Sequence, residues 1–208
     1  MRLQKTIQMV KVAIFSAVFC VLSPWMIPLP FSPVPVTLGI FVVYLAVALL
    51  GAKQGTLSVI IYLLLGMAGL PVFSGFSGGI AVLAGPTGGY AIGYIPCALL
   101  TGWLMKQGTK LGGKQRKPGK PENLQQADKE IANPKRLWKQ MLWNVAAMSV
   151  GMAACYLSGT VWFWIVMDGT YTITQILLVC VIPYLVFDMA KIGLAAVTIV
   201  EIRKKWKL

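Results

Sequence analysis

The sequence has no histidine and few charged residues of any kind. Histidine is the commonest metal ligand and general base near neutral pH, so its absence argues against hydrolytic or zinc chemistry. The patterns G-x-x-x-x-G-K-[ST], G-x-S-x-G and H-E-x-x-H are also absent, as is CxxC spacing. The chain therefore has no P-loop with which to use ATP, and we predict no catalytic residue, no cofactor and no metal site.

The scarcity of charge accompanies a large excess of apolar residues. Of 208 residues, 57% are hydrophobic and 12% are charged, whereas soluble domains contain about 45–50% apolar and about 25% charged residues. The chain is therefore predicted to be an integral membrane protein in the lipid bilayer. Its apolar runs are far too long for barrel strands, so the spans should be helices and the fold all-α.

The apolar runs predict six transmembrane helices in one membrane domain covering residues 1–208. Their approximate limits are 9–27, 36–51, 55–71, 85–105, 138–166 and 173–202. An even number of spans places both termini on the same side of the membrane.

Basic residues are distributed unequally between the two sides of this topology. Eighteen of the 19 lie in the termini, at Lys53 or in the polar stretch from Lys106 to Lys139, and the opposite loops contain none. This asymmetry predicts an N-in, C-in, multi-pass protein of the cell (cytoplasmic) membrane. It also explains the net charge of +13 without nucleic-acid binding. We interpret residues 106–137 as a basic cytoplasmic loop, a solvated tether with some attraction to anionic lipids.

Two of the opposite loops have unusual compositions. Residues 23–35 contain five prolines, and residues 71–79 combine glycines with Phe73 and Phe76. Glycine permits irregular backbone and the aromatic rings supply rigid apolar surface. The second loop is either a lid over a site or an ordinary hydrophobic loop resting on the bundle.

Lys191 is the only basic residue far from the ends of a long apolar segment, and Asp188 stands three residues before it. A charge at bilayer depth costs about 2.5–3.5 kcal/mol on insertion scales. The two side chains share one helix face with Tyr184. The pair is either a structural salt bridge or a ligand site in which Asp188 accepts and Lys191 donates hydrogen bonds. A proton relay is a weaker alternative because no other acid lies deep in a span.

Small residues recur at four-residue spacing in the fourth predicted span. Gly85, Gly89 and Gly93 share one helix face, a pattern that lets helices approach closely in lipid. Close packing is one interpretation. The other is that N–H groups at this helix start face a ligand together with Thr87, and Gly88 lies off the packing face.

Two further small-residue patterns occur in the first and fifth spans. Ala13 and Ala17 form a pair near the cytoplasmic end of the first span, suited either to internal packing or to docking of another membrane protein. Gly151, Cys155 and Gly159 in the fifth span predict helix packing.

Several blocks together resemble one known family. They are Pro33-Val34-Pro35-Val36-Thr37-Leu38, Gly66-Met67-Ala68-Gly69-Leu70-Pro71-Val72-Phe73, Gly78-Gly79, Gly85-Pro86-Thr87-Gly88-Gly89-Tyr90, and Pro183-Tyr184 with Asp188 and Lys191. In this order they resemble the BioY biotin-uptake proteins, the substrate-binding S components of energy-coupling-factor (ECF) transporters.

The resemblance implies a six-helix S-component bundle that captures biotin outside with high affinity and releases it inside. It also implies partners, namely a transmembrane coupling (T) protein and two cytoplasmic ATPases (A components). Ala13 and Ala17 match the motif by which S components contact the coupling protein. Two alternatives remain: a solitary small-solute carrier that works without ATPases, and a non-transport membrane assembly protein or enzyme.

The resemblance also points to site residues. They are Asp188 and Lys191, with Phe73, Phe76, Thr87, Gly88 and Tyr90 as further substrate-binding positions. Tyr184, which shares the helix face of Asp188, is also predicted to bind substrate. Two positions depart from the family pattern: Phe187 stands where glycine is usual and is expected to narrow the pocket, and Gly39 stands where glutamine is frequent, which removes a polar contact. The 106–137 loop is also longer than is usual for the family.

Overall fold

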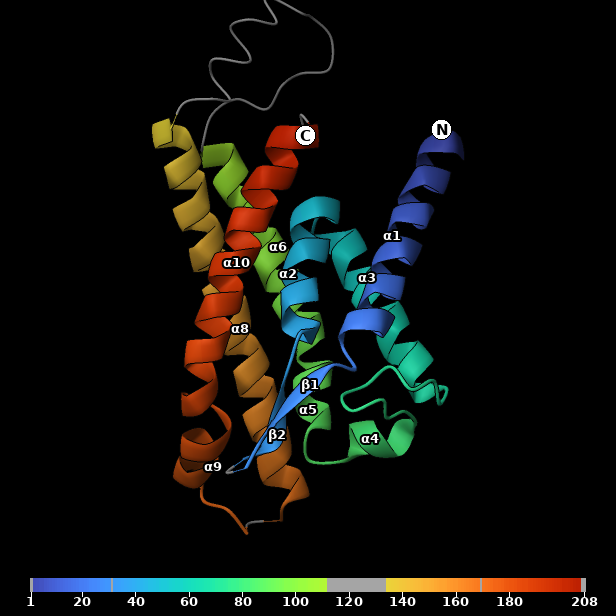
Figure 1. Cartoon of the computed structure of the whole chain (residues 1–208), viewed down its shortest axis with the longest axis vertical. Helices are drawn as coiled ribbons and strands as arrows, with labels where there is room; N and C mark the ends of the chain where they lie inside the picture. Colours follow the sequence, from blue (N-terminus) through green and yellow to red (C-terminus); the bar gives the residue numbers. More distant parts are fainter. Residues whose placement is uncertain (1, 31, 112–133, 169, 207–208) are drawn as a thin grey trace, which may run out of the picture.

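The structure is a computed structural model that describes residues 2–30, 32–111, 134–168 and 170–206 (Figure 1). Its long helices run side by side along the longest axis of the molecule. The helices are α1 (Arg2–Leu22), α2 (Gly39–Leu50), α3 (Ala52–Met67), α4 (Ile80–Ala84), α5 (Gly88–Ile92), α6 (Tyr94–Leu111), α8 (Pro134–Val166), α9 (Ile173–Cys180) and α10 (Ile182–Trp206).

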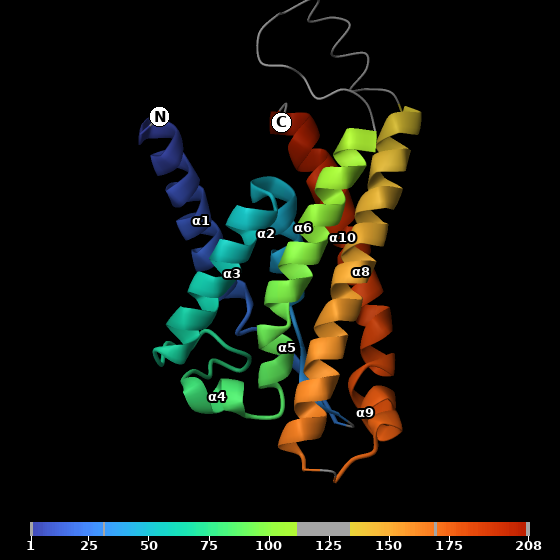
Figure 2. The same cartoon turned by 180° about the vertical axis from the view of Figure 1, so that it is seen from behind.

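Helix α2 occupies the centre of the bundle. It contacts α1, α3, α6 and α10, and Val42, Val43 and Tyr44 on it are fully buried. A helix that is apolar all round must be buried on all sides or lie in lipid. Its sequence, GIFVVYLAVALL, has no polar face, which agrees with this central position. Helices α1 and α10 lie on opposite sides of α2 (Figures 1 and 2).

Each of the six predicted spans contains helical residues, but only some of these helices are long enough to cross a membrane. Among the described residues, Leu3–Leu22 and Trp138–Val166 are long and apolar enough to cross a membrane. A third candidate is the bent pair Ile173–Cys180 and Ile182–Ile202, whereas α2 and α3 are shorter apolar helices. The six-span count therefore stays a prediction.

Several helix ends differ from the approximate span limits that we predicted. Helix α1 ends at Leu22 and not at 27, because Pro24 lacks the N–H that a continuing helix would use. The predicted span 85–105 is divided into α5 and α6 at Gly93. The last span bends by 42° between α9 and α10, just before Pro183. The predicted 106–137 loop is shorter, since α6 continues to Leu111 and α8 begins at Pro134, and its middle lies outside the described residues.

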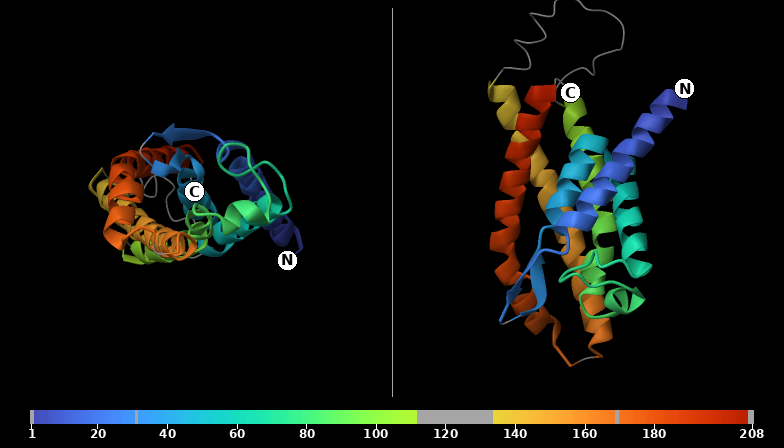
Figure 3. Two further views of the ribbon diagram at one scale, coloured as in Figure 1. Left: turned by 90° about the horizontal axis from the view of Figure 1, so that it is seen from below. Right: turned by 45° about the vertical axis from the view of Figure 1, so that its right-hand side comes forward.

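The proline-rich loop contains a β-hairpin that sequence analysis did not predict. Strand β1 (Met26–Leu29) pairs antiparallel with β2 (Ser32–Thr37), with Met26 opposite Thr37. Its prolines are compatible with an isolated two-stranded ribbon because each strand has an unpaired edge. The hairpin and α4 lie at the end of the molecule away from both termini (Figure 3).

Candidate functional site

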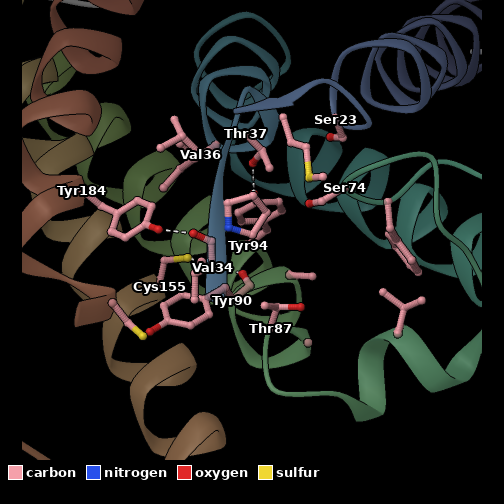
Figure 4. Close-up of a pocket in the computed structure, with 18 of the residues that line it drawn as sticks. Ser23, Val34, Val36, Thr37, Ser74, Thr87, Tyr90, Tyr94, Cys155 and Tyr184 are labelled. Atoms are coloured by element: carbon pink, nitrogen blue, oxygen red, sulfur yellow. Dashed lines mark hydrogen bonds between the residues drawn. The ribbon is translucent and has the colours of Figure 1, made fainter. Parts of the chain in front are cut away.

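A cavity of about 270 Å³ lies beside α2, at the level of the hairpin. It is lined by β2, the segment after α3, α5, α8 and α10 (Figure 4). Five of the seven tyrosines in the chain line it: Tyr62, Tyr90, Tyr94, Tyr156 and Tyr184. A tyrosine combines an apolar ring with a hydroxyl, so this wall suits a ligand that is apolar with a few polar groups.

The charged pair predicted from the sequence lies on this cavity. Lys191 Nζ donates a hydrogen bond to Asp188 Oδ1 over 2.8 Å, and Asp188 is only 6% exposed. Among the described residues that line the cavity, these two carry the only formal charges. Because the charges are paired, the cavity wall is neutral overall.

Tyr156, on another helix, also forms a hydrogen bond with Asp188. Its hydroxyl on α8 donates to Asp188 Oδ2 over 2.5 Å, so both carboxylate oxygens accept a hydrogen bond. A buried carboxylate is tolerated when it is paired and its lone pairs are satisfied. Tyr156 is not among the residues predicted from the sequence, although it directly follows Cys155 of the predicted packing seam. We call Tyr156, Asp188 and Lys191 the charged network.

The hairpin forms one wall of the cavity and is tied to α10. The Tyr184 hydroxyl donates to the backbone carbonyl oxygen of Val34 on β2 (Figure 4). Val34, Val36 and Tyr184 belong to one buried apolar cluster, which also contains Ile176 of α9. The hairpin is therefore a packed part of the site.

Gly39, the first family departure, makes room for Tyr94. A β-carbon at residue 39 would lie 2.6 Å from the Tyr94 hydroxyl oxygen, so any larger residue would displace this ring. The Tyr94 hydroxyl instead lies 3.3 Å from Thr37 Oγ1, at hydrogen-bonding distance. A tyrosine hydroxyl from α6 thus occupies the space beside residue 39 and supplies a polar group there.

Three of the predicted site residues line the cavity at the start of α5: Thr87, which precedes the helix, and Gly88 and Tyr90 within it. Gly88 has no room for a side chain, since its β-carbon would lie 1.8 Å from the carbonyl oxygen of Leu83. The Tyr90 ring packs on α8 at Gly159, and its hydroxyl has no hydrogen-bond partner among the described residues.

The two phenylalanines of the second loop have different positions. Phe73 is buried, lines the cavity and packs edge-on against Tyr62, with 5.7 Å between ring centroids. Phe76 is 59% exposed, lies outside the lining and packs edge-on against Trp25. The prediction that Phe76 lines the pocket therefore does not agree with the geometry.

Phe187, the second family departure, also lies outside the cavity lining, and it is 42% exposed. The expectation that it narrows the pocket is wrong. Residue 187 points away because neighbouring positions on a helix differ by about 100°, so the residue before a cavity-facing Asp188 faces elsewhere.

The predicted small-residue positions fall into two groups. Gly89 packs against Trp162 and Gly93 against the backbone of Cys155, as the close-packing interpretation predicts. Gly85 is in extended backbone between α4 and α5 and does not share their helix face, so that part of the prediction is wrong. Ala13 and Ala17 on α1 are exposed, whereas Ser16 between them is buried and donates to the carbonyl oxygen of Ser58 on α3. The alanine pair thus leaves a face of small residues open.

The sequence and structure of this chain are similar to those of one family of known proteins. The pattern of the BioY family matches residues 1–208. The "Biotin transporter BioY" of Thermotoga maritima is 33% identical over 197 residues, covering 95% of this chain and 96% of that protein. The "Biotin transporter BioY2" of Lactococcus lactis is 42% identical over 96 residues, 46% of this chain and 52% of its own. A crystal structure described as the S-component for biotin from an ECF-type ABC transporter superposes with a TM-score of 0.73 at 26% identity, covering 98% of this chain and 94% of that one.

Proposed function

Because this chain belongs to the BioY family, we propose that it is the high-affinity biotin-binding S component of an ECF-type vitamin uptake transporter. In this function it captures biotin outside the cell and releases it inside. It does so as a transport subunit and not as an enzyme.

The observation that carries this proposal is the charged network on the wall of the cavity. Biotin presents a cyclic urea, whose two N–H groups donate and whose carbonyl oxygen accepts hydrogen bonds. Asp188 supplies an acceptor and Lys191 keeps donors beyond the one used in its 2.8 Å bond to Asp188. The tyrosine rings and Phe73 supply apolar surface for the sulfur-containing ring and the hydrocarbon chain.

The orientation that follows from this function is N-in and C-in, in a multi-pass protein of the cell membrane. Two facts support it. The first is that both termini lie at one end of the molecule and the hairpin at the other (Figure 3). The second is that 18 of the 19 basic residues belong to the segments predicted to be cytoplasmic. The cavity beside the hairpin would then open towards the outside.

Uptake against a gradient needs a source of energy, and the sequence contains no P-loop with which to use ATP. We assign that role to a transmembrane coupling protein and two cytoplasmic ATPases, in keeping with the ECF-type complex named for the structural neighbour. The exposed Ala13 and Ala17 pair is the proposed docking surface for the coupling protein.

The test is titration of biotin into the purified protein in detergent. We expect a Kd below about 1 µM, equivalent to about −8 kcal/mol. Asp188→Asn and Lys191→Ala should each weaken binding while the protein stays folded. Asp168→Asn, an exposed acid outside the cavity, is the matched control. Binding weaker than micromolar in the unmodified protein would contradict the function.

A further inference from the structure

Four large apolar side chains are exposed on the two segments that lead into the hairpin and follow α3. They are Trp25 and Ile27 in the first segment and Phe76 and Ile80 in the second, and each is between 59% and 64% exposed. We call these four residues the apolar rim. The Trp25 and Phe76 rings pack edge-on with 6.0 Å between their centroids, so this contact joins the two segments into one patch. An exposed apolar patch of this kind marks an interaction surface.

The Phe76 ring is presented by a constrained turn. The Phe73 N–H donates to the Ser77 carbonyl oxygen over 2.9 Å, and the Gly75 N–H donates to the Pro24 carbonyl oxygen over 2.9 Å. Within this turn Phe76 has a φ of 56°, in the left-handed region that a bulky residue rarely adopts. The fold therefore accepts an unfavourable backbone conformation and still leaves an aromatic ring at the surface. This arrangement indicates that the ring is covered in the working protein.

The segments that carry the apolar rim contain no charged residue. Between Lys11 and Lys106 the sequence has Lys53 as its only charged side chain, and Lys53 stands at the start of α3, a helix length away from the loop that follows this helix. The contact surface of a soluble partner normally has a polar margin. The boundary of a lipid bilayer instead accepts tryptophan, phenylalanine and aliphatic side chains. The composition of the apolar rim therefore fits lipid.

The length of α1 places the apolar rim at the boundary of the bilayer. Leu3–Leu22 has 20 residues, which at about 1.5 Å per residue span about 30 Å, the thickness of the hydrocarbon core. Trp25 follows three residues after Leu22, so it lies where the chain leaves this core. Val21 on α1 and Leu64 on α3 are 63% and 56% exposed. The apolar rim thus continues the lipid-facing surface of these two helices.

The residues of the apolar rim adjoin residues that line the cavity. Met26, between Trp25 and Ile27, lines the cavity, and so does Ser77, which directly follows Phe76. Neighbouring residues of an extended segment point to opposite sides. One side of each segment therefore borders the cavity while the other side carries the apolar rim.

We propose that the apolar rim docks into the outer leaflet of the lipid bilayer, with Trp25 and Phe76 at the level of the headgroups. The two segments that border the cavity are then anchored at the boundary between lipid and water. The choice of the outer leaflet rests on the orientation given under the proposed function, whereas the docking itself does not depend on biotin.

Spin labels on the protein in lipid vesicles test the docking. The labelled variants are Ile27→Cys and Ile80→Cys, each combined with Cys20→Ser because the other three cysteines are buried. Both variants keep the Trp25–Phe76 contact. The measurement compares collisions of the label with oxygen, which concentrates in lipid, and with a water-soluble nickel chelate.

Two control positions define the expected result. Leu157→Cys labels a residue of the α8 span that is 68% exposed, and Asp168→Cys labels an exposed acid between α8 and α9. We expect the oxygen-to-nickel ratio at residues 27 and 80 to match that at Leu157→Cys and to exceed that at Asp168→Cys. Because residues 27 and 80 belong to different segments, a variant that fails to fold leaves the other to decide.

Two outcomes would overturn the docking. Ratios at both positions equal to that at Asp168→Cys would show that the apolar rim lies in water. Labels that are accessible to nickel in the isolated protein, and shielded from both reagents once the coupling protein and ATPases are added, would assign the apolar rim to a protein partner. Lipid-like ratios in a protein that binds no biotin would support the docking and contradict the proposed function.

Discussion

The hydroxyl of Tyr156 on α8 donates a hydrogen bond of 2.5 Å to the carboxylate of Asp188 on α10. This bond joins two helices across the wall of the cavity, and it leaves Asp188 with one donor on each oxygen. The carboxylate is thereby held in one orientation before any ligand arrives. Pre-organisation of this kind lowers the entropy cost of binding.

Replacing Tyr156 by phenylalanine should therefore weaken biotin binding without removing it. Loss of one hydrogen bond to a charged group predicts an effect of about tenfold in Kd, measured by calorimetric titration. Tyr171→Phe, an exposed tyrosine outside the cavity lining, is the control. If Tyr156→Phe and Asp188→Asn had strictly additive effects when combined, the two side chains would not act as one unit.

Gly39→Ala should displace the Tyr94 ring from its position beside Thr37. The new β-carbon would lie 2.6 Å from the Tyr94 hydroxyl oxygen, which requires the ring to move. We expect a biotin affinity lower by about threefold or more, since overpacking forces side chains off their preferred rotamers. Gly193→Ala on α10, where nothing lies within 4 Å of the added carbon, is the matched control.

The double variant Gly39→Ala, Tyr94→Leu distinguishes the effect of crowding at residue 39 from the effect of the Tyr94 hydroxyl. It removes the clash but also the hydroxyl. Recovery of affinity would assign the loss to crowding alone, whereas persistent weakness would show that the hydroxyl contributes. Wild-type affinity in Gly39→Ala itself would contradict the packing described around Tyr94.

Tyr184→Phe should loosen the hairpin from α10. The substitution removes the hydrogen bond to the Val34 carbonyl oxygen and leaves the apolar packing of the ring in place. We expect biotin to dissociate about three- to tenfold faster, because a net hydrogen bond contributes about 0.5–1.5 kcal/mol. Stopped-flow fluorescence during displacement of bound biotin measures this rate. Phe187→Leu, on the same helix but outside the cavity lining, should leave it unchanged, and an unaltered rate in Tyr184→Phe would mean that the hairpin does not retain the ligand.

Ala13→Trp and Ala17→Trp should disrupt assembly with the coupling protein and spare biotin binding. Both alanines are exposed on α1, away from the residues that line the cavity. A bulky residue on a small-residue face prevents close approach of helices. Co-purification with the T protein and ATPases is the measurement, and Ala153→Trp on the exposed face of α8 is the control. Equal loss of assembly and biotin binding would point to misfolding.

Local chemistry explains why much of the site was predictable. Asp188 and Lys191 stand out in the sequence because charge is expensive in an apolar segment, and both line the cavity. Thr87, Gly88, Tyr90, Phe73 and Tyr184 also line it, as the family blocks suggested. Phe76 does not line the cavity: its backbone has a positive φ of 56°, and its ring packs against Trp25.

Other residues of the site carry no local signal. Ser23, Tyr62, Tyr94 and Tyr156 are ordinary residues for apolar helices and their ends, and each reaches the cavity through packing between distant segments. The hairpin was missed for a related reason: its prolines predict an irregular loop, and only pairing between residues 26 and 37 makes them strands.

The sequence by itself determined the helical membrane class, the family and the charged pair, because apolar length, motif order and the cost of buried charge are properties of the chain alone. Tertiary structure decided which hydroxyl meets Asp188 and which ring occupies the space at Gly39. These depend on the distance between helices far apart in sequence, which is set by the packing of the whole bundle.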